Sequence, residues 1–512
     1  MINSVALAVD FSISSKLTYP FHLLQYADDT LLFSTTKGNA LQSLSLVLNT
    51  FSRISGIEIN WSKTSFVPFN IQPHELQQIA TVLNCAQTTL PLVYLGLPLT
   101  AKKPSRVCFQ VLIDKVNLKL ASWKSALLSR AGRIVLASSV LSSIPIYFMS
   151  VFQLPAWVIK AIDKVRRIFI WQGTTGKGLP LLSWSRVCLP KNLGGFGLID
   201  LRLQNIALLL RWLWRLYSQP SSLWSMVAKL LFAKRNNSTP PLGWNSNGSF
   251  FWRQLGALRF YFQISTRIEL CNGNNTLFWF DNWGGTNLCF FQHPNCVQNS
   301  SFLTVRTARR NWFNLFPAPM TQGHDLLFRQ LHGVRLTQGM DKFVWKWSSD
   351  GKYSSSTTYE AFISAGKVQF YLKNLWQLRI PPNVKTFLLL LAHDRLLTQC
   401  QLLKRNIVFQ PHCHLCQHDI LETAEHLFCS CPFSASLWSS LALDNIALLG
   451  VQHLLQYVCS LNRNDVTSVR LATALWSLWL ERNNRIFRNS TRTVQGVHDW
   501  LVQEAALFYK FT

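Results

Sequence analysis

Apolar and polar positions near the start of the chain follow two different periods. Residues 21–33, FHLLQYADDTLLF, place two apolar runs around Tyr26-Ala27-Asp28-Asp29, which predicts two short buried strands joined by a turn. Residues 40–54 repeat apolar side chains at helical spacing and predict an amphipathic helix. The chain therefore opens with a predicted hairpin followed by a helix.

The next segment predicts helices with a basic side. In VLIDKVNLKLASWKSALLSRAGR, Val116, Leu120 and Trp123 share one helical face, and Lys115 and Lys119 lie along another. We expect the apolar side chains to pack inward and the lysines to contact backbone phosphates.

An uncharged stretch runs from Ile134 to Val158 and is long enough for a membrane span. It contains several serines as well as Pro145 and Pro155, which make a lipid-facing helix unfavourable. A pair of buried helices broken at Ile144-Pro145 is the preferred interpretation. A membrane protein built on this stretch is the alternative.

The second half of the chain changes character twice. Residues 217–340 are rich in Asn, Gly, Ser and Trp, and their turn signals predict a small connector with β-hairpins. The following stretch, DKFVWKWSSDGKYSSSTTYEAF, predicts a hairpin around Asp350-Gly351 that leads into a helix.

Two stretches combine tryptophan with arginine. In RWLWRL, Trp212 and Trp214 are expected to be core residues rather than a platform for stacked bases. In ALWSLWLERNNRIF we expect the aromatic side chains to pack and the arginines to reach phosphate; these residues are Trp476, Trp479, Phe487, Arg482 and Arg485.

The net charge indicates which kind of partner the chain binds. The chain has 50 Lys and Arg against 23 Asp and Glu, a formal charge of +27, which favours a polyanion or an anionic surface. Residues 101–240 alone hold 21 basic and three acidic residues, a balance of 21 − 3 = +18. We therefore expect this region to form a groove for RNA or DNA.

Twelve cysteines are spread too thinly for a disulfide scaffold. The N-terminal stretch around Asp10 lacks the basic region of a secretion signal. The sequence thus predicts a reduced, intracellular location, in the nucleus or cytoplasm, and no secretion.

Three of the cysteines and one histidine have the spacing of a zinc site. Cys413 and Cys416 are followed by His426 and Cys431, in CHLCQHDILETAEHLFCSC. Thiolates and imidazole select Zn²⁺, and four such ligands form a closed structural site. The alternative is a set of buried thiols without metal. Other residues compete for the same ion, Cys429 foremost and then His412, His414 and His418.

The adjacent carboxylates of Asp28 and Asp29 repel each other, so this arrangement is unfavourable unless a cation binds there. The alternative is an ordinary surface turn, where Asp is common. Longer motifs bear on this choice: YADD is followed by GIEINWSKT and YLGLPL, then by LPKNLGGFGLIDLRLQNIALLLRWLWRL. This series resembles the second half of the palm in LINE-type (non-LTR) retrotransposon reverse transcriptases of plants. The stretches around the zinc spacing resemble the reverse-transcriptase zinc-binding domain.

The resemblance implies roles for individual residues. Asp28 would bind Mg²⁺ or Mn²⁺ with Asp29 in support, because polymerases hold two such ions with carboxylates. Lys63 matches the lysine near the departing pyrophosphate. The residues expected to bind primer or template are Tyr94, Leu95 and Gly96 of the primer grip, with Lys115, Lys119, Arg130 and Arg133.

The sequence departs from this family at its start. A working palm needs another metal-binding Asp and a fingers region upstream of YADD, and Asp10 is the one plausible substitute. We therefore expect the C-terminal portion of a reverse transcriptase, with a missing N-terminal polymerase half and no activity alone.

Together these patterns predict an α+β protein of five segments. They are a partial palm of hairpin plus helix (1–100), a basic helical thumb-like region (101–216), a β-containing connector (217–340), a helical zinc-binding module (341–440) and a helical tail (441–512). The predicted function is that of an RNA-directed DNA polymerase remnant that retains binding of zinc and of RNA and DNA as template-primer. The alternative is a host-adapted, zinc-containing nucleic-acid-binding protein with no polymerase role.

Overall fold

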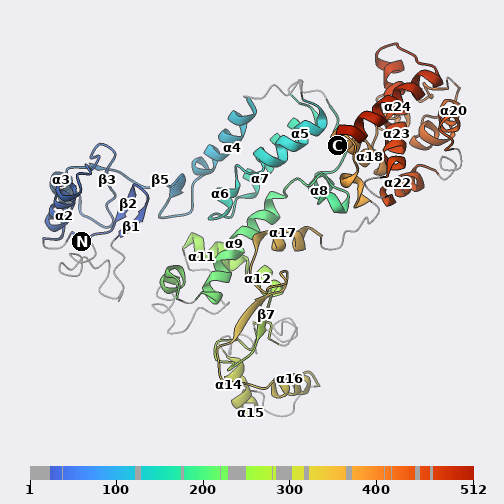
Figure 1. The fold of residues 1–512 in the computed structure, drawn as a ribbon. Coiled ribbons are helices and arrows are strands. Elements are labelled where there is room, and N and C mark those ends of the chain that lie inside the picture. Colours follow the sequence, from blue (N-terminus) through green and yellow to red (C-terminus); the bar gives the residue numbers. More distant parts are fainter. Residues whose placement is uncertain are drawn as a thin grey trace. The chain divides into compact units, whose positions relative to one another are not determined.

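The structure of the chain is a computed structural model. It describes residues 23–36, 39–121, 128–173, 178–219, 221–228, 249–279, 281–283, 303–315, 322–364, 372–408, 410–416, 418–443, 450–461 and 465–511. Helices predominate among these residues, and the strands form four two-stranded sheets, which fits the predicted α+β class (Figure 1). The chain divides into two compact units, residues 1–109 with 215–256 and residues 110–214 with 257–512.

The first unit contains the predicted hairpin and helix. Strand β1 (Leu23–Tyr26) pairs antiparallel with β2 (Asp29–Leu32), and α2 (Ala40–Ser55) ends at Gly56, whose φ of 71° closes the helix. The other elements are β3 (Ser65–Phe66), α3 (Pro73–Leu83), β4 (Ala86–Gln87), β5 (Leu92–Tyr94), β6 (Leu97–Leu99) and most of α11 (Phe250–Ala257).

The prediction that the two strands of the hairpin are buried is wrong. Tyr26 is 66% exposed, and Leu24 and Phe33 are exposed as well. The physical reason is that β1 and β2 form a sheet by themselves, since no third strand pairs with them among the described residues. A two-stranded sheet leaves both edges and much of each face open.

The second unit begins with a helical region. Its elements are α4 (Arg106–Ala121), α5 (Arg130–Leu136), η2 (Ala137–Leu141), α6 (Ile146–Met149), α7 (Ala156–Trp171), α8 (Trp184–Cys188), η3 (Lys191–Leu193) and α9 (Leu201–Ser218), of which α4 and α9 each cross a unit boundary. The buried Arg166 on α7 joins several of them: it donates to Asp163, to Ser142 Oγ and to the carbonyl of Ile199 at 2.8–2.9 Å.

The uncharged stretch forms short helices that break before Pro145, as the sequence predicts. Helix α5 passes into the π-helical η2, and α6 begins at Ile146, directly after the proline. No helix in the described part of the chain has the length and apolar character of a membrane span.

The described part of the predicted connector (217–340) contributes one strand to a two-stranded sheet, and the partner strand lies beyond residue 340, so this sheet is not the local β-hairpin that the sequence predicts. After α12 (Arg259–Ser265), strand β7 (Thr266–Glu269) pairs antiparallel with β8 (Lys342–Trp345). Three helices, α14 (Val305–Arg310), α15 (Trp312–Leu315) and α16 (Gln322–Gly333), complete the connector. Trp279 and Trp312 are fully buried in its core.

The predicted local hairpin at Asp350-Gly351 is only half right. A turn forms there, in which the Trp345 N–H donates to the Gly351 carbonyl at 2.7 Å, and α17 (Ser355–Ser364) follows as expected. The strand partner of β8 is the distant β7, however. The residues between the turn and α17 form no strand, because α17 already begins at Ser355.

The C-terminal part is a helical bundle around the long helix α23. It contains η6 (Leu375–Gln377), α18 (Pro382–Ala392), α19 (Gln399–Leu403), η7 (His426–Ser430), α20 (Pro432–Ser440), α22 (Val451–Ser460), α23 (Val466–Phe487) and α24 (Val494–Phe511). The predicted packing of Trp476 and Trp479 is confirmed, since both rings lie 5.2–6.2 Å from the ring of Phe387 on α18. The same prediction is wrong for Phe487, which is 75% exposed at the end of α23.

Candidate metal centre

Three short elements position the four predicted zinc ligands. Cys413 and Cys416 lie on a turn, His426 begins η7, and Cys431 precedes the first residue of α20. Cys413 Sγ lies 3.9 Å from Cys431 Sγ, and Cys416 Sγ lies 3.5 Å from His426 Nε2. All four ligand atoms fall within 4.8 Å of one another.

These distances fit a tetrahedral zinc ion. With Zn–S near 2.3 Å and Zn–N near 2.0–2.1 Å, tetrahedral angles place two sulfurs about 3.8 Å apart and a sulfur and a nitrogen about 3.6 Å apart. Cys413, His426 and Cys431 are buried and Cys416 is half-buried. Three thiolates and one imidazole leave no open position, so the site is suited to a structural ion.

Backbone N–H groups point at two of the sulfurs and favour their ionised form. The N–H groups of Cys416 and Leu415 donate to Cys413, and those of Ser434 and Phe433, at the start of α20, donate to Cys431. The hydrogen bond that the two sulfurs share lowers the pKa of Cys431 and, together with burial, raises the pKa of Cys413. A zinc ion would displace the protons that remain on the thiols.

His426 is also prepared as a ligand. Burial lowers the pKa of its imidazole, which therefore stays neutral near pH 7, the form that binds metal. The Thr423 hydroxyl accepts from the His426 backbone N–H and fixes the start of η7.

The competing residues lie outside this cluster. Cys429 is hydrogen-bonded to Glu425, and burial with that carboxylate raises the pKa of the thiol to about 12. His414 Nε2 contacts the Gln399 amide at 3.0 Å, and His412 pairs with Asp419. In the described part of the chain, the four predicted ligands are the one group of three or more Cys, His, Asp or Glu close enough to share an ion.

A buried ion pair that sequence reasoning missed supports the loop between the ligands. Glu422 accepts from Arg482 Nε and Nη2, at 3.1 and 2.7 Å, and from the backbone N–H of Gln399. Glu422 is fully buried and Arg482 nearly so. The expectation that Arg482 reaches phosphate is therefore wrong, because its guanidinium is enclosed in the bundle. A charged residue between apolar neighbours, as in ILETAEHLF, is the signal that could have suggested a buried partner.

The residues assigned to polymerase chemistry are exposed. Asp28 lies in the hairpin turn and Asp29 begins β2, after Ala27 with a φ of 51°. Lys63 lies on a turn in which its N–H donates to Asn60. No carboxylate cluster forms among the described residues, and Asp10 lies outside them. The assignment of this unit to a reverse-transcriptase palm stays a prediction.

The predicted primer-grip residues form a tight turn. Strands β5 and β6 are joined by Leu95 and Gly96, whose φ values of 49° and 77° are both positive. Such a turn matches the twist of a hairpin, and glycine accepts this conformation at little cost. Tyr94 precedes the turn and is half-buried.

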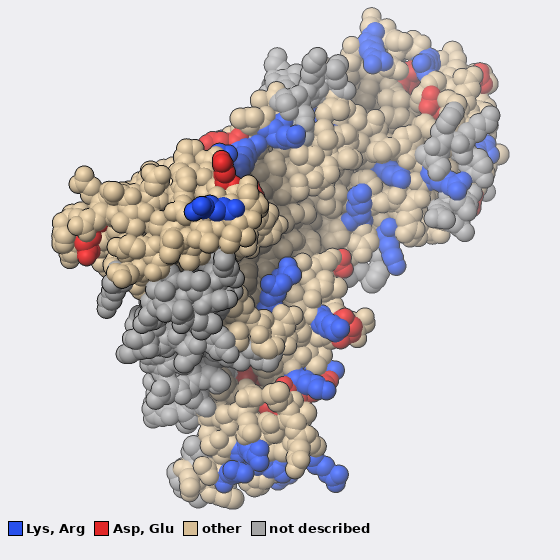
Figure 2. Space-filling view, turned by 60° about the vertical axis from the view of Figure 1, so that its left-hand side comes forward, with Lys and Arg blue, Asp and Glu red and all other residues tan. Residues whose placement is uncertain are grey.

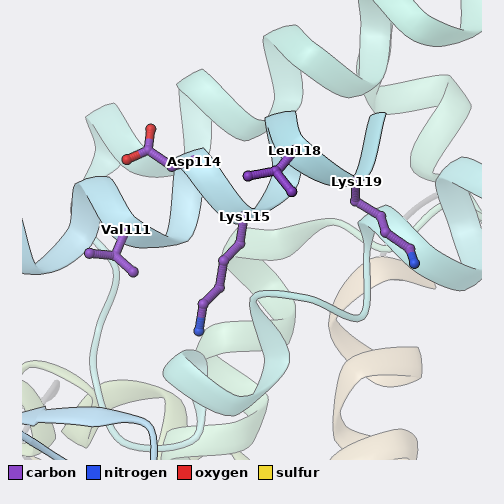
Figure 3. A pocket seen from close by; sticks show the side chains of 5 residues that line it. All are labelled: Val111, Asp114, Lys115, Leu118 and Lys119. Carbon is purple, nitrogen blue, oxygen red and sulfur yellow. The ribbon is translucent and has the colours of Figure 1, made fainter. Parts of the chain in front are cut away.

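The predicted basic contacts divide into two kinds. Lys115 and Lys119 are exposed on α4 and, with Val111, Asp114 and Leu118, line a pocket of about 500 Å³. Figure 3 shows both lysines on the same side of the helix, with Asp114 pointing away.

Arg130 and Arg133 belong to the second kind. Both are partly buried on α5: Arg130 lies over the Trp171 ring, and Arg133 donates to the Phe169 carbonyl. Burial lowers the pKa of both guanidinium groups. Both guanidinium groups therefore make contacts inside the helical region.

The tryptophans of RWLWRL are half-buried and packed against other parts of the chain, so the prediction that they are core residues is confirmed only in part. Trp212 donates to the Ser150 carbonyl at 2.8 Å, and the Trp214 ring lies 5.7 Å from that of Trp345.

Similarity to known proteins supports the interpretation of this cluster as a zinc site. Residues 353–438 match the family described as zinc-binding in reverse transcriptase. A putative ribonuclease H protein of Arabidopsis thaliana is 27% identical over 360 residues, which cover 67% of this chain and 57% of that protein. An uncharacterized mitochondrial protein of the same plant is 26% identical over 143 residues, 28% of this chain and 92% of that protein. The matches and the cluster together support a zinc-binding protein related to reverse transcriptases.

Proposed function

We propose that the chain is the C-terminal portion of a LINE-type reverse transcriptase that binds one structural Zn²⁺ and holds nucleic acid. The observation that carries the zinc proposal is the cluster of Cys413, Cys416, His426 and Cys431 within 4.8 Å. The ion would connect the turn at 413–416 to the start of α20. Metal binding and local folding are then coupled, as in other small zinc modules.

Metal content of the purified chain tests this proposal. Wild type should hold one zinc per chain, and Cys413→Ser and Cys431→Ser should lose it. Cys429→Ser is the matched control, because that thiol lies in η7, between the ligands His426 and Cys431, and contacts Glu425 instead. Stoichiometric zinc in both ligand variants, or its loss in Cys429→Ser alone, would show that the ligand set is wrong.

Nucleic-acid binding is the second part of the proposal. The support is the +18 balance of residues 101–240, of which Lys102, Lys103, Lys115 and Lys119 are exposed. Figure 2 shows Lys and Arg spread over the visible face, with Asp or Glu beside several of them. Such a distribution suits backbone phosphates rather than base readout, so we expect RNA and DNA to bind with little sequence preference.

Polymerase chemistry is the third part. By resemblance the chain descends from an RNA-directed DNA polymerase, in which Asp28 and Asp29 would hold Mg²⁺ or Mn²⁺. The two exposed carboxylates at one turn supply one part of a two-ion site. We therefore propose that the chain alone does not polymerise. We also propose that it acts inside the cell, in the nucleus or cytoplasm. The alternative is a host-adapted, zinc-containing protein that binds nucleic acid and has no polymerase role.

A further inference from the structure

Arg485 connects helix α23 to the chain between the ligands Cys413 and His426, called the zinc loop below. It lies well beyond the residues 353–438 that match the zinc-binding family. Its Nη1 donates to the Leu415 carbonyl at 2.6 Å and also lies 3.3 Å from the His414 carbonyl. Both carbonyls belong to the turn between the ligands Cys413 and Cys416. The guanidinium therefore binds the backbone of the zinc loop itself.

The two peptide groups that Arg485 contacts are the ones that serve the Cys413 sulfur. The His414 carbonyl shares a peptide group with the Leu415 N–H, and the Leu415 carbonyl shares one with the Cys416 N–H. Both of these N–H groups donate to Cys413. A cation at the carbonyl end of a peptide polarises the N–H at its other end, so that hydrogen bonds in series strengthen one another.

Other contacts hold the guanidinium in this position. Its Nε donates at 2.8 Å to Glu481, whose side chain is only 1% exposed, and the same carboxylate oxygen accepts from the Arg492 N–H. The guanidinium carbon lies 4.6 Å from the centre of the Phe433 ring. The N–H of Phe433 donates to the second buried sulfur, Cys431.

We infer that Arg485 is a positioning residue of the zinc site, which acts through two peptide groups on the Cys413 thiolate. Three thiolates carry one negative charge more than a zinc ion can balance, and N–H donors on the polarised peptide groups stabilise part of it. The functional zinc module then extends past residue 438 to include α23. This inference rests on the proposed zinc function.

Zinc affinity of the full chain, measured by competition with a chromophoric chelator, tests the inference. Arg485→Ala should bind zinc about 10- to 100-fold more weakly, the usual effect of losing an outer partner of a metal ligand. Arg485→Lys keeps the charge but cannot reach Glu481 and both carbonyls together, so its affinity should fall between the two. Arg470→Ala is the control, since Arg470 is exposed on the same helix.

A second readout separates positioning from general support of the fold. With Co²⁺ in place of zinc, the thiolate-to-metal absorption bands should shift in Arg485→Ala, because the Cys413 sulfur loses hydrogen-bond strength. Alkylation of Cys413 in the zinc-loaded variant should also be faster for the same reason. If Arg485→Ala does not fold, Arg485→Lys carries the test alone.

The outcomes of these measurements are distinct. Wild-type affinity together with an unchanged Co²⁺ spectrum in a folded Arg485 variant would overturn the inference and leave the zinc proposal standing. Failure of the wild-type chain to bind either metal would overturn the zinc proposal itself. An equal loss of affinity in Arg470→Ala would show a nonspecific charge effect, which also contradicts the inference.

Discussion

Arg482 on α23 and Glu422 in the zinc loop are 60 positions apart in the sequence and form an ion pair of 2.7 Å inside the bundle. Both side chains are at most 2% exposed. The pair joins the C-terminal helices to the chain between Cys416 and His426, and Glu422 also binds the N–H of Gln399 on α19. The zinc loop is therefore attached to the bundle by charge as well as by apolar packing.

Removal of one partner of this pair should be strongly destabilising. Arg482→Ala leaves a buried carboxylate without its counter-ion, and we expect a loss of about 3–5 kcal/mol in the free energy of unfolding. The double variant Glu422→Leu, Arg482→Met should lose less, because it removes both charges. Denaturant unfolding of the zinc-loaded chain measures this, with Arg470→Ala as the exposed control expected within about 0.5 kcal/mol of wild type. A double variant as unstable as Arg482→Ala would contradict the role of the uncompensated charge.

Stability should also fall in mild acid through His393. This residue follows α18, accepts from Arg186 at Nδ1 and donates from Nε2 to the Gly194 carbonyl, both at 3.0 Å. Burial lowers the pKa of His393 below its usual 6.5, and the nearby Arg186 and Arg395 act in the same direction. The unfolded chain then binds more protons than the folded chain, so this contribution is present at pH 7 and is lost as the pH falls below about 6.5.

The matching experiment compares wild type with His393→Gln between pH 7.5 and 5.5. Unfolding free energies should fall more steeply with acid in wild type, because glutamine does not titrate. The zinc ligands contribute equally to both proteins, so the difference between the two curves isolates His393. Parallel curves over this range would rule out the proposed proton linkage.

The sequence predicted local elements far better than their surroundings. The hairpin at YADD and helix α2 follow from apolar period and turn chemistry, which are local. The exposure of β1 and β2 does not, since burial depends on what pairs with a strand. The strand partner of β8 was missed for the same reason, because β7 lies more than 70 residues earlier.

The metal centre was predictable because its ligands are chemically specific and closely spaced. The structure brings together the same four residues that the spacing suggests. The prediction that Arg482 and Arg485 contact phosphate was wrong. The sequence around an Arg does not show whether its partner is a phosphate or a buried carboxylate. Glu422 and Glu481 decide that question only once the helices are packed.

Primer extension is expected to be absent. The purified chain should not extend a primer on an RNA template with Mg²⁺ or Mn²⁺, since the exposed pair Asp28 and Asp29 offers too few fixed ligands for two ions. The assay compares wild type with Asp28→Ala, and an active reverse transcriptase serves as positive control. Template-dependent extension that disappears in Asp28→Ala would show that the site is complete, and Asp10→Ala would then test the remaining ligand.

Binding of nucleic acid should depend steeply on salt. Neutralised phosphates release counterions, so the affinity for duplex DNA or structured RNA should fall linearly on a double-logarithmic plot against salt concentration. Lys115→Ala and Lys119→Ala, on the side of α4 that Figure 3 shows, should each weaken binding to all sequences alike and reduce the slope by about 1. Lys404→Ala, an exposed lysine outside residues 101–240, is the control and should leave the slope unchanged. Fluorescence anisotropy at several salt concentrations gives both quantities, and an affinity independent of salt, or no binding at ~50 mM salt, would exclude the basic region as a phosphate-binding surface.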